Sequence, residues 1–144
     1  MSAGAAVDPR GPRFAAAVTT VVLALVLVTG WWPLLAAQTV VFAAGALVGP
    51  RAAPYSLLYR LLVAPRLKPT AEREEAAPLR FAQAVGFAFA LAGTVGYATG
   101  VGALALVATA FALFAALLNA AFNFCLGCEV YLLLRRSTRR AERA

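Results

Sequence analysis

The chain has 144 residues, of which 62% are hydrophobic and 13% are charged. Its mean hydropathy of +0.80 excludes an ordinary soluble domain, because a chain of this length cannot hide so much apolar surface in one core. The net charge of +7 does not indicate nucleic-acid binding, since the basic residues flank apolar segments instead of forming one patch with interleaved aromatic side chains. We therefore expect a lipid bilayer as the main partner, with anionic headgroups as counterions, and no nucleic acid.

Four uncharged segments are candidates for membrane-spanning helices, which need about 20 apolar residues each. They are Phe14 to Thr29, Leu34 to Gly49, Phe81 to Thr99 and Val101 to Cys128. Trp31, Trp32 and Pro33 separate the first two segments, and aromatic residues of this kind are typical of a headgroup boundary. The second segment is short, and Gln38 and Thr39 are its only polar side chains. The pattern predicts an all-α membrane protein with four transmembrane helices.

The basic residues predict the orientation of these helices. All 13 Lys and Arg residues lie in three places, which are the segment up to Arg13, the segment from Arg51 to Arg80, and the tail from Arg135 onward. Short loops rich in Lys and Arg stay on the cytoplasmic side of a membrane. We therefore expect a multi-pass protein with both termini and the middle loop in the cytoplasm. A cleaved signal peptide is disfavoured, because the first apolar run is as long as a full span.

The chain also contains an internal repeat. Arg13-Phe-Ala-Ala-Ala-Val18 returns as Arg80-Phe-Ala-Gln-Ala-Val85, and each predicted hairpin is followed by a run of Tyr and Leu that ends in arginine. Two hairpins that begin on the same face form a parallel repeat about an axis along the membrane normal. We expect one domain over residues 1–144, with repeat 1 over 13–67, a solvated linker over 68–78 and repeat 2 over 79–136. The alternative is chance similarity in Ala- and Leu-rich sequence.

Two further patterns concern packing and the membrane surface. Pro54 to Leu67 mixes apolar residues with Arg60 and Arg66, which predicts an amphipathic helix that lies in the cytoplasmic interface. Small residues recur at four-residue spacing from Ala84 to Gly100 and from Ala108 to Ala120. Helices in lipid associate where small side chains let their backbones approach. We expect these two stripes to face each other or the first hairpin.

The two cysteines of the chain form a Cys-Leu-Gly-Cys motif, from Cys125 to Cys128. This spacing places both thiols on one side of a helical turn, where they can form a redox pair or hold a metal between two thiolates. A single helix from Val101 to Leu134 would be longer than the hydrocarbon core. We therefore expect a bend at Asn123 or Gly127 and a short helix after the motif.

The reactivity of the thiols depends on that bend. If Asn123 caps the short helix, both cysteines lie in its first turn, where free backbone N–H groups favour a thiolate. If the helix runs straight through, they lie near a helix C-terminus beside Glu129 and react slowly. In a third reading the cysteines are small packing residues, and the nearby asparagines only bond neighbouring helices. The candidate catalytic residues are Cys125 and Cys128, and the supporting residues are Asn119, Asn123, Gly127 and Glu129.

Missing residue types exclude several classes of chemistry. The chain has no histidine, so a hydrolytic triad and haem ligation by histidine are excluded. A complete zinc site usually needs four ligands, which only a homo-oligomer would supply, and a permanent disulfide is disfavoured in the reducing cytoplasm. We expect no bound cofactor and no metal site. Four short helices also enclose too little volume for a solute transporter, unless the chain forms a homo-oligomer.

Several of these segments resemble one known family in their order along the chain. They are Asp8-Pro-Arg-Gly-Pro-Arg-Phe14, Arg80-Phe-Ala-Gln-Ala-Val-Gly86 and Asn119-Ala-Ala-Phe-Asn-Phe-Cys-Leu-Gly-Cys-Glu-Val-Tyr131. The chain resembles the small bacterial integral membrane proteins grouped as the domain of unknown function 4395. The resemblance implies a location in the bacterial cytoplasmic membrane and no assigned activity. Members are often associated with thioredoxin-like proteins and sulfurtransferases, which implies thiol or sulfur chemistry at Cys125 and Cys128.

Two functions then compete. In the first, the dithiol exchanges electrons or sulfane sulfur with a soluble cytoplasmic thioredoxin-like or rhodanese-like partner through a mixed disulfide. Passing those electrons onward in the bilayer would need a quinone or another subunit. In the second, the protein is a non-enzymatic membrane scaffold or anchor whose cysteines are structural or bind a soft metal such as Cu(I). We favour the first, in which the chain is at most a thiol–disulfide exchange or sulfur-transfer component.

Overall fold

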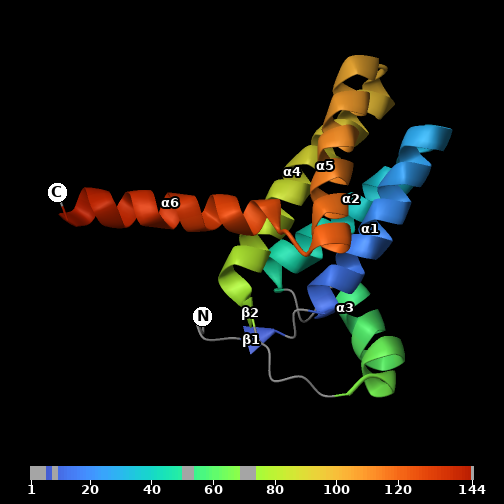
Figure 1. Ribbon diagram of the computed structural model, residues 1–144. Coiled ribbons are helices and arrows are strands. Elements are labelled where there is room, and N and C mark those ends of the chain that lie inside the picture. Colours follow the sequence, from blue (N-terminus) through green and yellow to red (C-terminus); the bar gives the residue numbers. More distant parts are fainter. Residues whose placement is uncertain (1–5, 8–9, 50–53, 69–73, 144) are drawn as a thin grey trace.

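The computed structural model describes residues 6–7, 10–49, 54–68 and 74–143. Its long helices are α1 (Arg10–Thr29), α2 (Trp32–Leu47), α4 (Ala76–Thr99), α5 (Gly102–Phe122) and α6 (Leu126–Arg143). Figure 1 shows α1, α2, α4 and α5 gathered in one bundle, whereas α6 runs crosswise away from it. The predicted all-helical class is thus confirmed, apart from two short strands.

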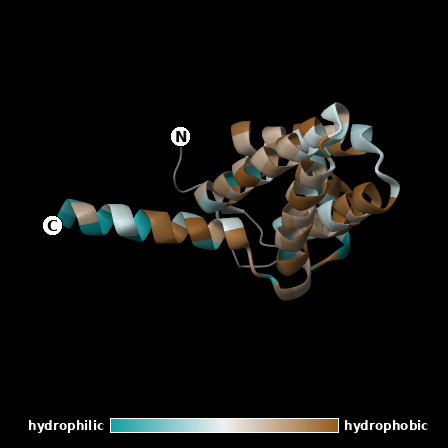
Figure 2. Ribbon diagram, turned by 90° about the horizontal axis from the view of Figure 1, so that it is seen from above, coloured by the Kyte–Doolittle hydropathy of each residue, from teal (hydrophilic) through white to brown (hydrophobic). Residues whose placement is uncertain are grey.

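Three of these helices are long and apolar enough to cross a membrane, namely α1 with 20 residues, α4 with 24 and α5 with 21. At about 1.5 Å per residue, each reaches the roughly 30 Å of a hydrocarbon core. Helix α2 is apolar but has only 16 residues. Large apolar side chains, such as Val28, Val40 and Phe111, are exposed on the outside of the bundle, and Figure 2 shows hydrophobic colour over much of it. By length and composition, these three helices are suited to a membrane protein.

The two uncharged turns each follow a glycine in a left-handed conformation. Gly30 has a φ of 68° and Gly100 a φ of 80°, and only glycine adopts such angles without strain. Each glycine ends its helix and lets the chain reverse within a few residues. Pro33 then lies in the first turn of α2, where a missing N–H is harmless. The predicted break between the first two segments is confirmed.

Helix α4 is the centre of the bundle, because it packs against α2, α5 and α6, while α1 packs mainly against α5. At the end of the bundle with the uncharged turns, a Cβ atom on Gly96 would lie 2.6 Å from the backbone nitrogen of Ala105. Small residues thus bring α4 and α5 together, as expected for helices in lipid. The core between the helices consists of Leu23, Val26, Leu35, Phe42, Ala90 and Ala112.

The predicted packing stripe of α4 is partly wrong. Ala84 and Ala88 are exposed, whereas the buried small residues of this helix include Ala90, Gly93 and Gly96. The buried residues recur at three-residue spacing because α4 is wedged between α2 and α5 and so buries an arc that one four-residue stripe does not follow. On α5 the expected alanines are buried or half-buried.

The segment after α2, for which the sequence predicts a helix over residues 54–67, is helical. Its predicted helical character is confirmed, although the hydrogen-bonding pattern changes along it. The helix ends near Pro65, which has no N–H to donate, and Ser56 and Tyr59 face inward while several leucines are exposed. The segment comprises α3 (Pro54–Leu58), a π-helical turn η2 (Tyr59–Val63) and a 3-10 turn η3 (Ala64–Arg66).

The structure between the two hairpins differs from the solvated linker that the sequence predicts over residues 68–78. Residues 69–73 lie outside the described part of the chain. Beyond them, β2 (Glu74–Glu75) pairs antiparallel with β1 (Ala6–Val7), a contact that no sequence pattern indicated. Helix α4 then begins at Ala76, where solvated linker was expected, because Ala76 and Pro78 are buried and proline is well suited to a first helical turn.

Candidate functional site

The turn that carries the cysteines begins at Asn123, because α5 ends at Phe122. Asn123 follows it in a left-handed conformation, with φ of 54° and ψ of 33°, which asparagine tolerates better than most residues. The N–H of Asn123 donates to the carbonyl oxygen of Asn119 at 3.0 Å, and that of Phe124 donates to Leu118 at 3.2 Å. These bonds close the end of α5. The bend is thus at Asn123, one of the two predicted positions.

Cys125 occupies the N-cap position of α6. Its Sγ accepts a hydrogen bond from the N–H of Cys128 at 3.2 Å, and its carbonyl oxygen accepts one from Glu129 at 3.0 Å. An acceptor at this position satisfies an N–H group that has no partner within the helix. The expectation that Asn123 caps this helix is wrong, because that residue ends α5 instead. The helix is also not short, since it has 18 residues and begins between the two cysteines.

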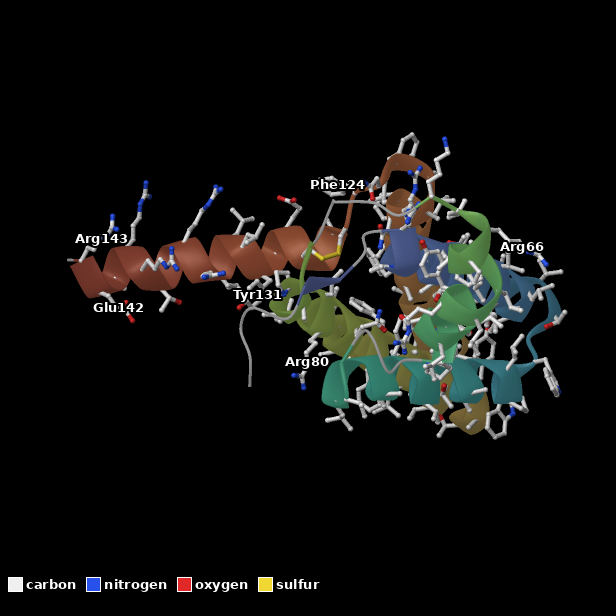
Figure 3. All side chains as sticks on the ribbon, turned by 90° about the horizontal axis from the view of Figure 1, so that it is seen from below. Arg66, Arg80, Phe124, Tyr131, Glu142 and Arg143 are labelled. Carbon is white, nitrogen blue, oxygen red and sulfur yellow. A yellow bond between two sulfur atoms is a disulfide. The ribbon has the colours of Figure 1, made fainter. Side chains whose placement is uncertain are left out.

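A disulfide joins Cys125 and Cys128, whose Cα atoms are 5.2 Å apart. Figure 3 shows the bonded sulfur atoms at the start of α6. Both residues are half-buried, so the sulfurs are neither sealed in the core nor fully exposed. The straight-helix alternative is therefore wrong, and the cysteines lie at the positive end of α6, where a negatively charged sulfur is favoured.

Helix α4 packs against this turn. A Cβ atom on Gly127 would lie 2.7 Å from both the Cα and the Cβ of Ala82, so the backbone of α6 touches α4 closely enough to require glycine. Cys128 packs against a small cluster of Ala76 and Leu79 in the first turn of α4. Ala76, which was predicted to lie in the linker, thus forms part of the surface against which the second cysteine packs.

The other supporting residues have different places. Asn119 is half-buried in the last turns of α5, whereas the side chains of Asn123 and Glu129 are exposed. Glu129 lies in the first turn of α6, where its charge is favourable to the helix dipole. Within the described ranges, no group of three or more His, Cys, Asp or Glu residues is positioned to hold a metal ion. The structure therefore brings together the two cysteines and Gly127, and Asn123 contributes through its backbone.

An arginine from α1 holds the end of α5. The guanidinium of Arg13 donates to the carbonyl oxygens of Ala120 at 3.1 Å and Ala121 at 3.5 Å, just before the turn. Arg80 of α4 donates in the same way to two carbonyl oxygens at the end of α2, at 3.0 Å each. A cation at the carbonyl end of a helix is favourable. The sequence pattern paired Arg13 with Arg80 but did not indicate this role.

A family comparison agrees with this architecture. The family model described as domain of unknown function DUF4395 matches residues 7–136. The chain belongs to the DUF4395 family. The match runs from β1 into α6 and includes both cysteines, so the resemblance noted from the sequence is confirmed. No curated protein and no solved structure matches the chain.

The DUF4395 chain also contains a cavity beside the thiol site. It has a volume of about 300 Å³ and extends between the helices of the bundle, from α3 to the start of α6. Cys125 and Gly127 line it, and so does Asn119. Most of the other lining side chains are apolar, and none of the lining residues is charged. The cavity therefore suits an uncharged and largely apolar molecule.

Two polar side chains meet in this cavity of the DUF4395 chain. Tyr55 Oη donates a hydrogen bond to Gln38 Oε1 at 2.6 Å, and burial raises the pKa of the Tyr55 phenol, so the hydroxyl remains a donor even in alkaline solution. Gln38 is 1% exposed, and its Nε2 has no hydrogen-bond partner among the described residues. A buried donor without a partner costs about 1–3 kcal/mol. The sequence signal was an amide in an otherwise apolar span, but it was not connected to the site.

Proposed function

We propose that Cys125 and Cys128 form a thiol–disulfide exchange site for a soluble thioredoxin-like or rhodanese-like partner. The observation that carries this proposal is the pair of bonded, half-buried sulfurs in the first turn of α6. When the bond is reduced, the N–H of Cys128 and the helix N-terminus stabilise Cys125 as a thiolate. Cys125 is then the attacking sulfur, and Cys128, which packs against α4, resolves the intermediate.

The exchange balances without any further oxidant. The Cys125 thiolate attacks one sulfur of a partner disulfide, which forms a mixed disulfide and releases a partner thiolate. Cys128 loses its proton and attacks Cys125 Sγ, which restores the internal disulfide and releases the second partner thiolate. Two electrons pass to the partner, and the reverse sequence reduces this chain. With a persulfide partner, the same thiolate accepts the outer sulfur atom and releases the partner thiol.

The proposed site lies at the cytoplasmic face of a bacterial membrane. Arg13 and Arg80 bond the helix ends that lie next to α6 and α3, and the arginines of α6 follow from the same end. Since basic residues remain in the cytoplasm, this end of the bundle is cytoplasmic, together with both termini. In this arrangement α2 is a fourth, short crossing, and the segment 54–66 lies in the interface.

The two halves of the chain are proposed to be a tandem repeat. If the two hairpins are exchanged, α1 corresponds to α4 and α2 corresponds to α5. The contact between α1 and α5 then corresponds to the contact between α4 and α2, and both contacts are extensive. The same exchange relates Arg13 to Arg80. It also relates a Phe14–Tyr59 ring pair, with centroids 5.8 Å apart, to a Phe81–Tyr131 pair at 5.7 Å. These matched contacts support a duplicated hairpin.

The test is a trapping experiment in native membranes. We expect reduced Cys128→Ser protein to form a stable mixed disulfide with a thioredoxin-like protein, because the attacking sulfur remains and the resolving sulfur is gone. Cys125→Ser protein is the matched control and should form little adduct. Alkylation against pH should also show one thiol that reacts faster than an ordinary cysteine. Two slow thiols and no adduct with either variant would remove the exchange function.

A membrane scaffold is the second candidate function, and the shape of α6 favours it. This helix extends from the bundle with exposed arginines along its outer part, as a docking element would. A scaffold requires no sulfur chemistry, so it should keep its partner and its cellular role when both cysteines are replaced by serine. Loss of the cellular role in the double serine variant, with normal protein levels in the membrane, supports exchange instead.

A further inference from the structure

The cavity beside the cysteines combines features that point to one class of ligand. None of its lining residues is charged, so it disfavours a charged ligand, and it extends to Cys125. Its volume of about 300 Å³ is at the lower end for small-molecule sites, so it accommodates a ring-sized group but not a long chain. The part of a ligand that lies in the cavity should therefore be uncharged and about as large as one ring, with any remainder outside.

The polar groups of the cavity select a hydrogen-bond acceptor. Tyr55 donates to Gln38 Oε1, so the amide of Gln38 is oriented by a bond to its oxygen. Its Nε2 is buried and has no partner among the described residues, although Gln38 lines the cavity. The two amide protons of Nε2 thus lack an acceptor, and an oxygen atom of a ligand that reached them would supply one. A carbonyl group meets that requirement.

The cavity opens on an apolar surface of the bundle. Three phenylalanines that line it are also exposed, which are Phe89 at 37%, Phe111 at 59% and Phe114 at 55%. The rings of Phe89 and Phe111 lie beside each other, with centroids 5.9 Å apart. These residues belong to α4 and α5, two of the helices suited to cross a membrane. A long apolar tail can therefore leave the cavity between these rings and remain in lipid.

We propose that this cavity binds the ring of an isoprenoid quinone and that the quinone oxidises the Cys125–Cys128 dithiol. One quinone carbonyl oxygen accepts a hydrogen bond from Gln38 Nε2, and the tail passes between the exposed phenylalanines. This inference rests on the proposed exchange function for its redox step, whereas the binding of the quinone is independent of it. The chain would then connect a cytoplasmic thiol partner to the quinone pool of the membrane.

The redox step balances in atoms and electrons. The two thiols lose two protons and two electrons, and one sulfur–sulfur bond forms between Cys125 and Cys128. The quinone gains both electrons and both protons, so that its two carbonyl groups become the hydroxyl groups of a hydroquinone. The resulting disulfide is the bond that the structure contains. A partner dithiol then reduces it again by the exchange described above.

The experiment uses the full chain in phosphatidylcholine nanodiscs with decylubiquinone as the probe. Binding is measured by equilibrium titration against empty nanodiscs, and reduction is followed anaerobically by quinone absorbance after the protein has been reduced and the reductant removed. We expect saturable binding and one hydroquinone formed for each dithiol. Gln38→Leu should weaken binding about tenfold, the factor expected for one lost hydrogen bond. Cys128→Ser, at a position that does not line the cavity, should bind normally and reduce no quinone, because the dithiol is gone.

Thr109→Val is the matched control for loss of a buried polar group. Thr109 is 0% exposed and its Oγ1 also has no partner among the described residues, but it does not line the cavity. We expect this variant to bind quinone as the wild type does. If Gln38→Leu protein does not fold, Tyr55→Phe serves instead, because it removes only the hydroxyl that orients the amide, and it should weaken binding roughly threefold.

Two results would overturn the quinone proposal. One is uptake that does not saturate and equals that of empty nanodiscs, as expected if the cavity holds only lipid acyl chains. The other is equal binding by wild type, Gln38→Leu and Tyr55→Phe proteins. Either result leaves the trapping experiment with the soluble partner unaffected. Conversely, saturable binding that depends on Gln38, without any mixed disulfide, would support the quinone site and remove the exchange function.

Discussion

The first half of the chain, residues 10–66, and the second half, residues 76–143, make matching contacts but differ in their third helical segment. In each half an arginine from the first helix bonds the carbonyl end of the second helix of the other half. In each half the phenylalanine next to that arginine packs on a tyrosine in the third helical segment of the same half. The framework is therefore shared, and it places a third helix at the same end of the bundle twice.

The halves differ in how that third helix begins. In the first half it starts at Pro54, changes its hydrogen-bonding pattern and ends at Arg66. In the second half it starts with a sulfur cap at Cys125 and continues as a regular helix to Arg143. The comparison teaches that only the second half carries the cysteine turn, and that this turn is held by the close contact between Gly127 and Ala82.

The largest expected effect comes from breaking that contact. Gly127→Ala places a Cβ atom 2.7 Å from the Ala82 backbone, so α6 has to move away from α4. We expect a loss of about 3 kcal/mol of stability, the upper end for overpacking, and faster trypsin cleavage at the arginines of α6. In the first half, Gly11→Ala meets only Tyr59 ring carbons, at 3.5 Å and beyond.

Gly11→Ala is thus the matched control and should leave thermal unfolding in detergent unchanged or slightly raised. The measurements are the midpoint of unfolding and the rate of cleavage in both variants. Equal cleavage rates in wild type and Gly127→Ala protein would show that α6 is not held by this contact.

A smaller effect is expected from the arginines that bond the helix ends. Arg13→Met and Arg80→Met each remove hydrogen bonds from a charged donor, which are worth about 1.5–3 kcal/mol when shielded from water. Arg80 is half-buried and Arg13 is exposed, so we expect the larger loss from Arg80→Met. Only Arg13→Met should change the rate of cysteine alkylation in the reduced protein, because Arg13 bonds the last turn before the cysteines. The same change in alkylation for both variants would contradict this assignment.

Three apolar helices of membrane-spanning length and the uncharged turns could be predicted because they depend on local chemistry. Runs of apolar residues predict helices in lipid, and Gly30 and Gly100 end them in the way that glycine does elsewhere. The start of α4 could not be predicted in this way, since Cys128 of α6 packs against Ala76 and Leu79, and the local sequence does not indicate that contact. The length of α6 could have been predicted, because neither proline nor glycine interrupts the chain after Gly127.

The site required long-range information. Asparagine suits both a helix N-cap and a left-handed position, so the local sequence does not decide which helix end Asn123 serves. The choice follows from the position of α6 on α4, which is a tertiary contact. The Gln38–Tyr55 bond likewise depends on the packing of α3 against α1 and α2. The cysteines themselves were evident from the sequence, because they are the only two in the chain.

The smallest effect is expected from the two ring pairs, and it tests whether the halves share one framework. Phe14→Leu and Phe81→Leu each remove one tilted aromatic contact, which is worth about 0.5–1.5 kcal/mol beyond the buried area. Both phenylalanines are half-buried, so we expect similar shifts in the unfolding midpoint. Their consequences should nevertheless differ, because Phe81 packs on Tyr131 of α6 and Phe14 packs on Tyr59. Only Phe81→Leu should increase trypsin cleavage of α6. An equal increase in Phe14→Leu protein would mean that the two halves unfold together and that the contact between Phe81 and Tyr131 does not hold α6 by itself.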